Sequence, residues 1–241
     1  MAMKGILLKW LSLIVVITPS IIKLMVYRRV YRYSIGRNVR IGLSWIWVGR
    51  LHLGDNVQIG HFNRFKNIPD VEIGNYTVIG TGNTFTSSSE FTNDVGMTVR
   101  GNKPMLVIGE HCGISLMHYF DIQDRVEIGA YTTIAGKGSD FFTHYLDVVS
   151  STQSTKPIGI GKYCIVGSST CFTPGARIAD YSVVGMGAVV TREHKETHCL
   201  IGGNPAVIIH KLPRDAAYFK RNVGWVGSFA GSPFESRRSG R

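Results

Sequence analysis

The C-terminal half of the sequence carries a six-residue period. Every sixth residue from position 160 is large and apolar, namely Ile160, Val166, Phe172, Ile178, Val184 and Val190. A small residue stands four positions after each of the first five, namely Cys164, Thr170, Ala176, Ser182 and Ala188. This period fits neither a helix of about 3.6 residues per turn nor an alternating strand. It predicts an all-β solenoid, in which each turn of a larger coil stacks on the one before it.

The same period extends less regularly toward the N-terminus. It appears as apolar-Gly pairs from Ile35-Gly36 to Ile128-Gly129. Two segments interrupt it, one from Thr86 to Met105 and the other from Ala135 to Pro157. Long insertions in a solenoid leave the coil as loops, and loops on a rigid scaffold commonly carry binding groups. We therefore expect two extruded loops.

The N-terminal segment is apolar and interrupted. Residues 5–27 are apolar apart from Lys9, Lys23 and a few small polar residues. Pro19-Ser20 divides this stretch in two. A membrane span needs about 20 apolar residues, so this stretch is a poor one, and no signal-peptide cleavage site follows it. We expect a broken helical segment at the inner face of the cytoplasmic membrane, where the arginines that follow would hold it. The alternatives are packing on the solenoid or on a neighbouring subunit and, less favoured, a true span.

These features divide the chain into four parts. We expect an apolar and basic helical segment (1–34), the solenoid (35–200), a C-terminal turn and short helix (201–228) and a disordered basic tail (229–241). The formal net charge of +11 suits anionic lipid or a phosphorylated cofactor, and no nucleic-acid-binding module is present. The four cysteines show no CxxC spacing, which predicts reduced packing residues in a cytoplasmic protein.

Two longer segments carry a family resemblance. They are KPIGIGKYCIVGSSTCFTPGARIADYSVVGMGAVVT (156–191) and IGGNPAVIIHK (201–211). With the tandem repeats, they resemble the hexapeptide-repeat acyltransferases, a left-handed parallel β-helix family that includes sugar O-acetyltransferases. The resemblance spans about residues 35–211. It implies a left-handed parallel β-helix, a homotrimer with active sites between neighbouring protomers, and acetyl-CoA as the acyl donor without a metal.

Acyl transfer from a thioester to a hydroxyl needs a group that removes the hydroxyl proton. A neutral imidazole suits this role near neutral pH. His144 is the best candidate, because it lies in the second predicted loop, in a segment (GKGSDFFTHYLD, 136–147) that resembles the family's histidine loop. A partner must orient the other ring nitrogen. Asp140, Asp147 and Asp121 are the candidate carboxylates, and we favour Asp140.

The resemblance also supplies candidate donor-binding residues. Its positions along the coenzyme track correspond to Gly167, Ser168, Gly185 and Gly187, and its adenine and phosphate end corresponds to Asn204 and Lys211. Lys195 and Arg214 are further candidates for phosphate pairing. A backbone amide near Ser168 or Gly185 is expected to receive the oxyanion.

The sequence therefore predicts an acetyl-CoA-dependent O-acetyltransferase that acts on a sugar of a surface polysaccharide or glycolipid. The nearest alternative is N-acetylation of a nucleotide-linked amino sugar, which would use the same base and donor site. Two further alternatives are a non-catalytic trimeric scaffold and a metalloenzyme like the γ-class carbonic anhydrases, for which His111, His118 and His144 are available.

Overall fold

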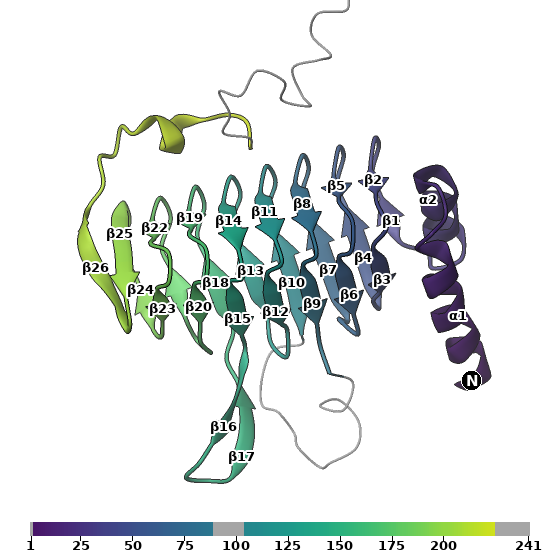
Figure 1. Cartoon of the computed structure of the whole chain (residues 1–241), viewed down its shortest axis with the longest axis horizontal. Coiled ribbons are helices and arrows are strands. Elements are labelled where there is room, and N and C mark those ends of the chain that lie inside the picture. Colours follow the sequence, from purple (N-terminus) through teal and green to yellow (C-terminus); the bar gives the residue numbers. More distant parts are fainter. Residues whose placement is uncertain (1, 89–103, 225–241) are drawn as a thin grey trace, which may run out of the picture.

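The chain winds into a triangular prism of parallel strands. The computed structural model describes residues 2–88 and 104–224. Over these residues the coils build three sheets, which we call A, B and C, with strands of successive coils paired in parallel (Figure 1). The fold class predicted from the sequence, a parallel β-helix with an extruded loop and apolar N-terminal helices, is confirmed. The predicted C-terminal helix is one short 3-10 turn, η1 (Ala217–Lys220).

Each complete coil contributes one strand to each sheet, in the order A, B, C, and the last coil ends in sheet B. Sheet A comprises β1 (Ser34–Ile35), β4 (Arg50–Leu53), β7 (Asp70–Ile73), β10 (Met105–Ile108), β13 (Val126–Ile128), β18 (Ile158–Ile160), β21 (Arg177–Ile178) and β24 (Glu193–His194). Sheet B comprises β2 (Arg40–Ile41), β5 (Gln58–Ile59), β8 (Val78–Thr81), β11 (Gly113–Leu116), β14 (Thr133–Lys137), β19 (Ile165–Val166), β22 (Val183–Val184), β25 (Cys199–Gly203) and the antiparallel β26 (Ala206–Lys211). Sheet C comprises β3 (Trp45–Trp47), β6 (Arg64–Lys66), β9 (Thr84–Thr86), β12 (Tyr119–Asp121), β15 (Asp140–Phe142), β20 (Cys171–Phe172) and β23 (Val189–Val190).

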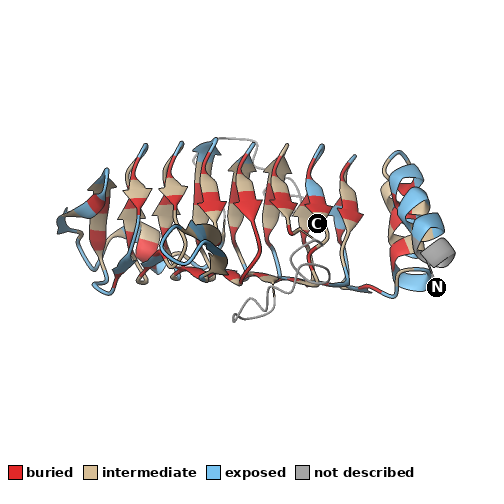
Figure 2. Ribbon diagram, turned by 90° about the horizontal axis from the view of Figure 1, so that it is seen from below, coloured by how far each residue is buried: buried red, intermediate tan, exposed pale blue. Residues whose placement is uncertain are grey.

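The six-residue period arises because successive short strands of the later coils each bury an apolar residue in the prism. Figure 2 shows buried residues on the strands of successive coils. Inside sheet C these side chains form a column of stacked rings with centroids 4.3–4.9 Å apart. Its members are Phe65, Phe85, Phe120, Phe141 and Phe172. Identical inward positions on successive coils therefore stack directly, which buries a continuous core that no single coil forms alone.

A second column of rings follows the edge where sheet A turns into sheet B. Its members are Tyr76, His111, Tyr131, Tyr163, Tyr181 and His198, and all six have a positive φ of 54–60°. The segment after β26 returns along this edge. Tyr218 donates its hydroxyl hydrogen to the Cys164 carbonyl at 2.9 Å, and Phe219 packs edge-on against Tyr181 and His198. The sequence pattern did not reveal this column, because four tyrosines and two histidines share the turn position at unequal spacings along the chain.

The second predicted loop is shorter than expected. Ala135–Phe142 stay in the prism as parts of β14 and β15, because Phe141 continues the column of rings. Only the antiparallel hairpin of β16 (His144–Asp147) and β17 (Thr152–Thr155) leaves the prism (Figure 1). Most of the first predicted loop, and the predicted tail 229–241, lie outside the described residues.

Two helices close the N-terminal end of the prism (Figure 1). They are α1 (Ala2–Val15) and α2 (Ser20–Arg29), and Pro19 at the start of α2 separates them as the sequence predicted. Within the described residues, neither helix is long and apolar enough to cross a membrane. The inner faces of both helices pack on the first coil. The alternative prediction, that this segment packs on the solenoid, therefore holds for these inner faces.

Candidate active site

His144 stands where the extruded hairpin leaves the edge between sheets C and A. It is the first residue of β16 and follows Thr143, which is fully buried directly after β15. The Thr143 carbonyl accepts a hydrogen bond from the Lys156 backbone N–H at 2.9 Å, which closes the base of the hairpin. The buried base fixes the backbone of His144, whereas its side chain is 37% exposed. An imidazole held in this way is both positioned and accessible.

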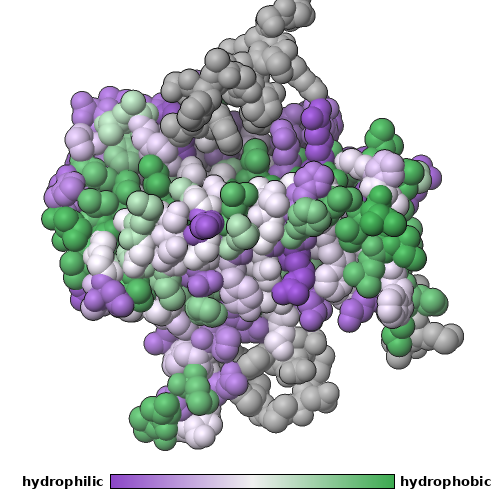
Figure 3. All heavy atoms as spheres, in the orientation of Figure 1, coloured by the Kyte–Doolittle hydropathy of each residue, from purple (hydrophilic) through white to green (hydrophobic). Residues whose placement is uncertain are grey.

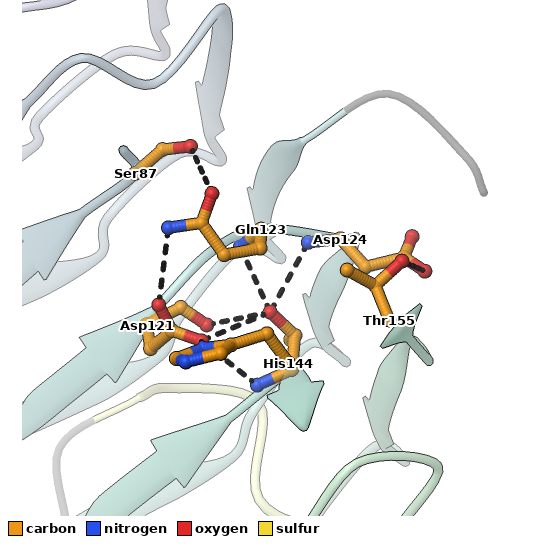
Figure 4. A network of polar contacts seen from close by, with 7 residues as sticks. Ser87, Asp121, Gln123, Asp124, His144 and Thr155 are labelled. Atoms are coloured by element: carbon orange, nitrogen blue, oxygen red, sulfur yellow. Dashed lines mark hydrogen bonds and ion pairs between the residues drawn. The ribbon is translucent and has the colours of Figure 1, made fainter. Parts of the chain in front are cut away.

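A buried carboxylate orients this imidazole. His144 Nδ1 lies 2.6 Å from Asp121 Oδ2, and the Asp121 side chain is only 4% exposed (Figure 4). Asp121 ends β12, the strand beside β15, and its register partner is Phe142, two residues before His144. The hydrogen bond to Asp121 raises the pKa of His144 above its ordinary value, and burial opposes this rise only in part.

Asp121 is itself held by neighbouring donors (Figure 4). Its Oδ2 accepts from the Thr143 backbone N–H at 3.2 Å, and its Oδ1 accepts from Gln123 Nε2 at 3.2 Å. The Thr143 hydroxyl donates to the Asp121 carbonyl at 2.8 Å and accepts from the Gln123 N–H at 2.8 Å. Ser87 donates to Gln123 Oε1 at 3.2 Å. This network fixes the carboxylate in one orientation before any substrate binds.

The geometry defines which nitrogen can act as a base. When His144 is neutral, the contact with the Asp121 carboxylate requires the proton on Nδ1, because a carboxylate only accepts hydrogen bonds. Nε2 then carries the lone pair. The carboxylate also stabilises the imidazolium that forms when Nε2 takes a proton. The pair is thus suited to remove a proton from a hydroxyl or amine.

Our preference for Asp140 as the orienting residue is wrong in this structure. Asp140 begins β15 beside Tyr119 and Cys171, at the opposite end of the strand from His144. Four residues of extended chain separate the two by about 13 Å. Asp147, the other flanking candidate, accepts hydrogen bonds from the backbone N–H groups of Val149 and Ser150 and so caps the hairpin turn.

Most of the predicted donor-binding residues gather at a different edge, between sheets B and C. This group comprises Gly167, Ser168, Gly185, Gly187 and Asn204, which all follow strands of sheet B. The backbone N–H of Gly167 donates to the Val184 carbonyl, and that of Gly185 donates to the Ile201 carbonyl. The expected oxyanion donor is therefore not the Gly185 amide, because the next coil already uses it.

Lys211 lies apart from that group. It ends β26 opposite Cys199, at the edge between sheets A and B, and forms an ion pair with Glu196. With Lys195 and Arg214 it lines an open hollow of about 480 Å³. The structure therefore brings the three predicted phosphate-pairing cations together but separates them from Asn204, because β26 runs its full length between the two places.

The alternative chemistries are poorly supported by the arrangement. His111, His118 and His144 lie at three different edges of the prism, so one chain does not bring them together as metal ligands. Among the described residues, no group of three or more His, Cys, Asp or Glu side chains is placed to hold a metal. Burial raises the pKa of the Cys164 thiol to about 12, which suits the packing role predicted for it rather than a nucleophile.

The fold and the site define a parallel β-helix protein with a carboxylate-oriented imidazole at one edge. No family model matches the sequence. The chain is 27% identical over 163 residues to the bifunctional protein GlmU of Azoarcus sp. (strain BH72). This match covers 58% of the chain but only 36% of GlmU, so the chain spans about a third of that relative.

Two solved structures show a similar architecture. One is a hexapeptide-repeat acetyltransferase from Vibrio cholerae O1 biovar eltor in complex with acetyl-CoA, with a TM-score of 0.44, 18% identity and coverage of 84% of each chain. The other is a variant of AntD, an N-acyltransferase from Bacillus cereus, in complex with dTDP-4-amino-4,6-dideoxyglucose and coenzyme A. Its TM-score is 0.45 at 13% identity, and the match covers 78% of this chain and 87% of AntD.

Proposed function

We propose that this protein is an acetyl-CoA-dependent O-acetyltransferase that acts on a sugar of a surface polysaccharide or glycolipid, at the inner face of the cytoplasmic membrane. The observation that supports this most strongly is the contact of 2.6 Å between His144 Nδ1 and the buried Asp121 carboxylate. It supplies the oriented base that acyl transfer to a hydroxyl requires. The relatives with bound acetyl-CoA or coenzyme A are consistent with such a reaction.

In the proposed reaction His144 moves one proton. Nε2 takes the proton of the sugar hydroxyl as its oxygen attacks the thioester carbonyl carbon. The new C–O bond forms, the C–S bond breaks, and the imidazolium returns the proton to the thiolate that leaves. Asp121 stays ionised throughout and stabilises the imidazolium. The products are the acetylated sugar and free coenzyme A thiol, and no covalent enzyme intermediate is needed.

The donor site is proposed to form between protomers of a homotrimer. His144 and the predicted donor residues around Ser168 belong to different edges of the prism, separated by the width of sheet C. A neighbouring protomer that presents one edge to the other would bring the two groups together. Lys195, Lys211 and Arg214 lie at the third edge, between sheets A and B, in a hollow that Glu196 also lines, so we do not assign them to the coenzyme phosphates.

The test is thiol release from acetyl-CoA with a panel of sugars, nucleotide sugars, amino sugars and lipid-linked oligosaccharides. The wild-type protein should release thiol with at least one acceptor. His144→Ala should lower turnover by about 10²–10⁴-fold while acetyl-CoA binding stays nearly intact. His210→Ala, an exposed histidine on β26, is the matched control and should retain turnover. Equal turnover of His144→Ala and wild type would remove His144 from the mechanism, and transfer only to amino sugars would favour N-acetylation.

A further inference from the structure

The N-terminal helix pair is a fixed part of the prism rather than a loose extension. Lys23 is fully buried between α1, α2 and the first coil, where its ammonium donates to the carbonyls of Val16 at 3.0 Å and of Gly42. Trp45 Nε1 donates to Ser12 Oγ of α1 at 2.8 Å. These contacts fix which faces of the two helices point outward.

The outward faces of both helices are apolar. Figure 3 shows hydrophobic side chains gathered over α1 and α2, and Figure 2 shows the same helices exposed on the side away from the coils. We call this surface the end face, and it consists of Ile6, Leu7, Trp10, Leu13, Ile14, Ile17, Ile21, Ile22 and Met25. Each of these side chains is at least 40% exposed, and Ile21 reaches 83%. Spacings of three and four residues place the members of each helix on one face, and Ile17 lies in the turn between the two helices.

The charge around the end face has one sign. Residues 1–54 contain nine Lys and Arg residues and no Asp or Glu. Of these nine, Lys23 is buried, and Arg37 and Arg50 form ion pairs with Asp55 and Asp70 on the coils. Arg29 is exposed at the C-terminal end of α2 and Lys9 is exposed on α1, whereas the Arg28 guanidinium turns back and donates to the Ile35 and Gly36 carbonyls of the first coil. An apolar stripe bordered by basic side chains is the pattern of helices that lie in the interface of an anionic membrane.

We propose that the end face docks on an anionic lipid bilayer and holds the prism end-on, with successive coils stacked away from the membrane. A second copy of this chain is the less suitable occupant, because two such ends would bring together two clusters of positive charge without acidic partners. A bilayer that contains anionic lipid supplies both the apolar interior and the opposite charge.

This end-on orientation sets the distance between His144 and the membrane. What that distance means for the acceptor rests on the proposed function. β3 in the first coil and β15, which precedes His144, are four strand spacings apart in sheet C. That distance is about 19 Å, and the helix layer adds about 10 Å. The reacting hydroxyl would therefore stand about 30 Å from the bilayer surface. The acceptor class that fits is a lipid-linked oligosaccharide of several sugars, not a lipid that carries a single sugar.

Vesicle flotation of the full-length protein tests the docking. Wild type should float with vesicles in which about a third of the phosphatidylcholine is replaced by phosphatidylglycerol. The double variant Ile14→Glu/Ile21→Glu should lower the ratio of bound to free protein by at least about tenfold. Ile209→Glu is the control, because Ile209 is 56% exposed on β26 at the other end of the prism. Lys9→Gln/Arg29→Gln should lower binding about fivefold per charge on anionic vesicles only.

The docking proposal is overturned if wild type does not float, or if Ile14→Glu/Ile21→Glu floats as well as wild type. It is also overturned if wild type does not bind vesicles but forms larger oligomers, and Ile14→Glu/Ile21→Glu dissociates these oligomers. The end face would then bind a second copy of this chain.

Activity separates this proposal from the proposed function. Ile14→Glu/Ile21→Glu should acetylate a water-soluble oligosaccharide at the wild-type rate but lose at least about tenfold in rate on the same glycan anchored in anionic vesicles. Equal loss on both acceptors would contradict the docking role. Preference of wild type for a vesicle-bound monoglycosyl lipid over the oligosaccharide would overturn the end-on orientation. Failure of all acceptors, with vesicle binding intact, would reject the proposed function alone.

Discussion

Replacing Asp121 by Asn removes the negative charge from the site while retaining its shape. The Thr143 N–H points at Oδ2, so the amide oxygen of Asn should occupy that position and the amide NH₂ should occupy the position of Oδ1. There it faces Gln123, whose own amide can rotate, because the Ser87 hydroxyl on its far side can accept as well as donate. His144 Nδ1 then still donates to an oxygen, so the tautomer that leaves Nε2 unprotonated is kept.

The loss in rate follows from the charge alone. A hydrogen bond to a charged group contributes about 1.5–3 kcal/mol, against about 1 kcal/mol for a neutral one. The His144 side chain is 37% exposed, so water screens part of this difference, and we take about 1–1.5 kcal/mol. Asp121→Asn should therefore lower turnover about tenfold, far less than His144→Ala. The pKa of His144 should also fall, because its largest upward cause is the Asp121 contact.

Thiol release from acetyl-CoA, followed as a function of pH with the best acceptor of the panel, measures both effects. Thermal unfolding of Asp121→Asn in parallel shows whether the fold is intact. An unchanged pH profile and rate in a folded variant would show that Asp121 does not act on the reacting imidazole. A loss as large as that of His144→Ala would show that the tautomer is not preserved, which would refute the role given to the Thr143 N–H.

Two further predictions follow from the same contacts. His144 must be neutral to act as a base, and its pKa is raised. The kcat/KM of wild type should therefore be low in acid, rise with pH through the elevated pKa of His144 and then level off. A kcat/KM that falls over this pH range would refute base catalysis by His144. Gly136→Ala should destabilise the protein by about 1–3 kcal/mol, since Gly136 has a φ of +66° and an added Cβ would lie 1.7 Å from Ser168 Oγ. Gly185→Ala, whose Cβ would meet only the Ile201 carbonyl at 3.6 Å, should unfold near the wild-type temperature, and equal melting of the two variants would contradict this explanation.

The repeated part of the fold was predictable because each coil repeats the same burial problem. Ile160, Val166 and Phe172 point inward on consecutive strands, so their spacing appears directly in the sequence. The prediction was less accurate where the period is obscured. Phe141 belongs to the column of stacked rings, but no six-residue pattern surrounds it, and Ala135–Phe142 were expected in a loop.

The candidate site was predictable only in part. His144 was found because its surroundings resemble a family motif, and its place at an extruded hairpin agrees with that expectation. Its partner was among the three candidate carboxylates but was ranked below Asp140, because Asp140 is closer in sequence. Asp121 lies 23 residues before His144 and reaches it through the pairing of β12 with β15. A search for acidic residues at the ends of strands one coil earlier would have ranked Asp121 first.

Sequence by itself determined the period, the apolar N-terminal helices and the single-signed charge around them, because each of these depends on residues close together in the chain. Tertiary structure decided which carboxylate meets His144, which edge each predicted donor residue occupies, and which faces of α1 and α2 remain exposed. The physical reason is register: a coil of variable length brings distant residues together only when its strands pair, and the sequence does not state the length of each coil.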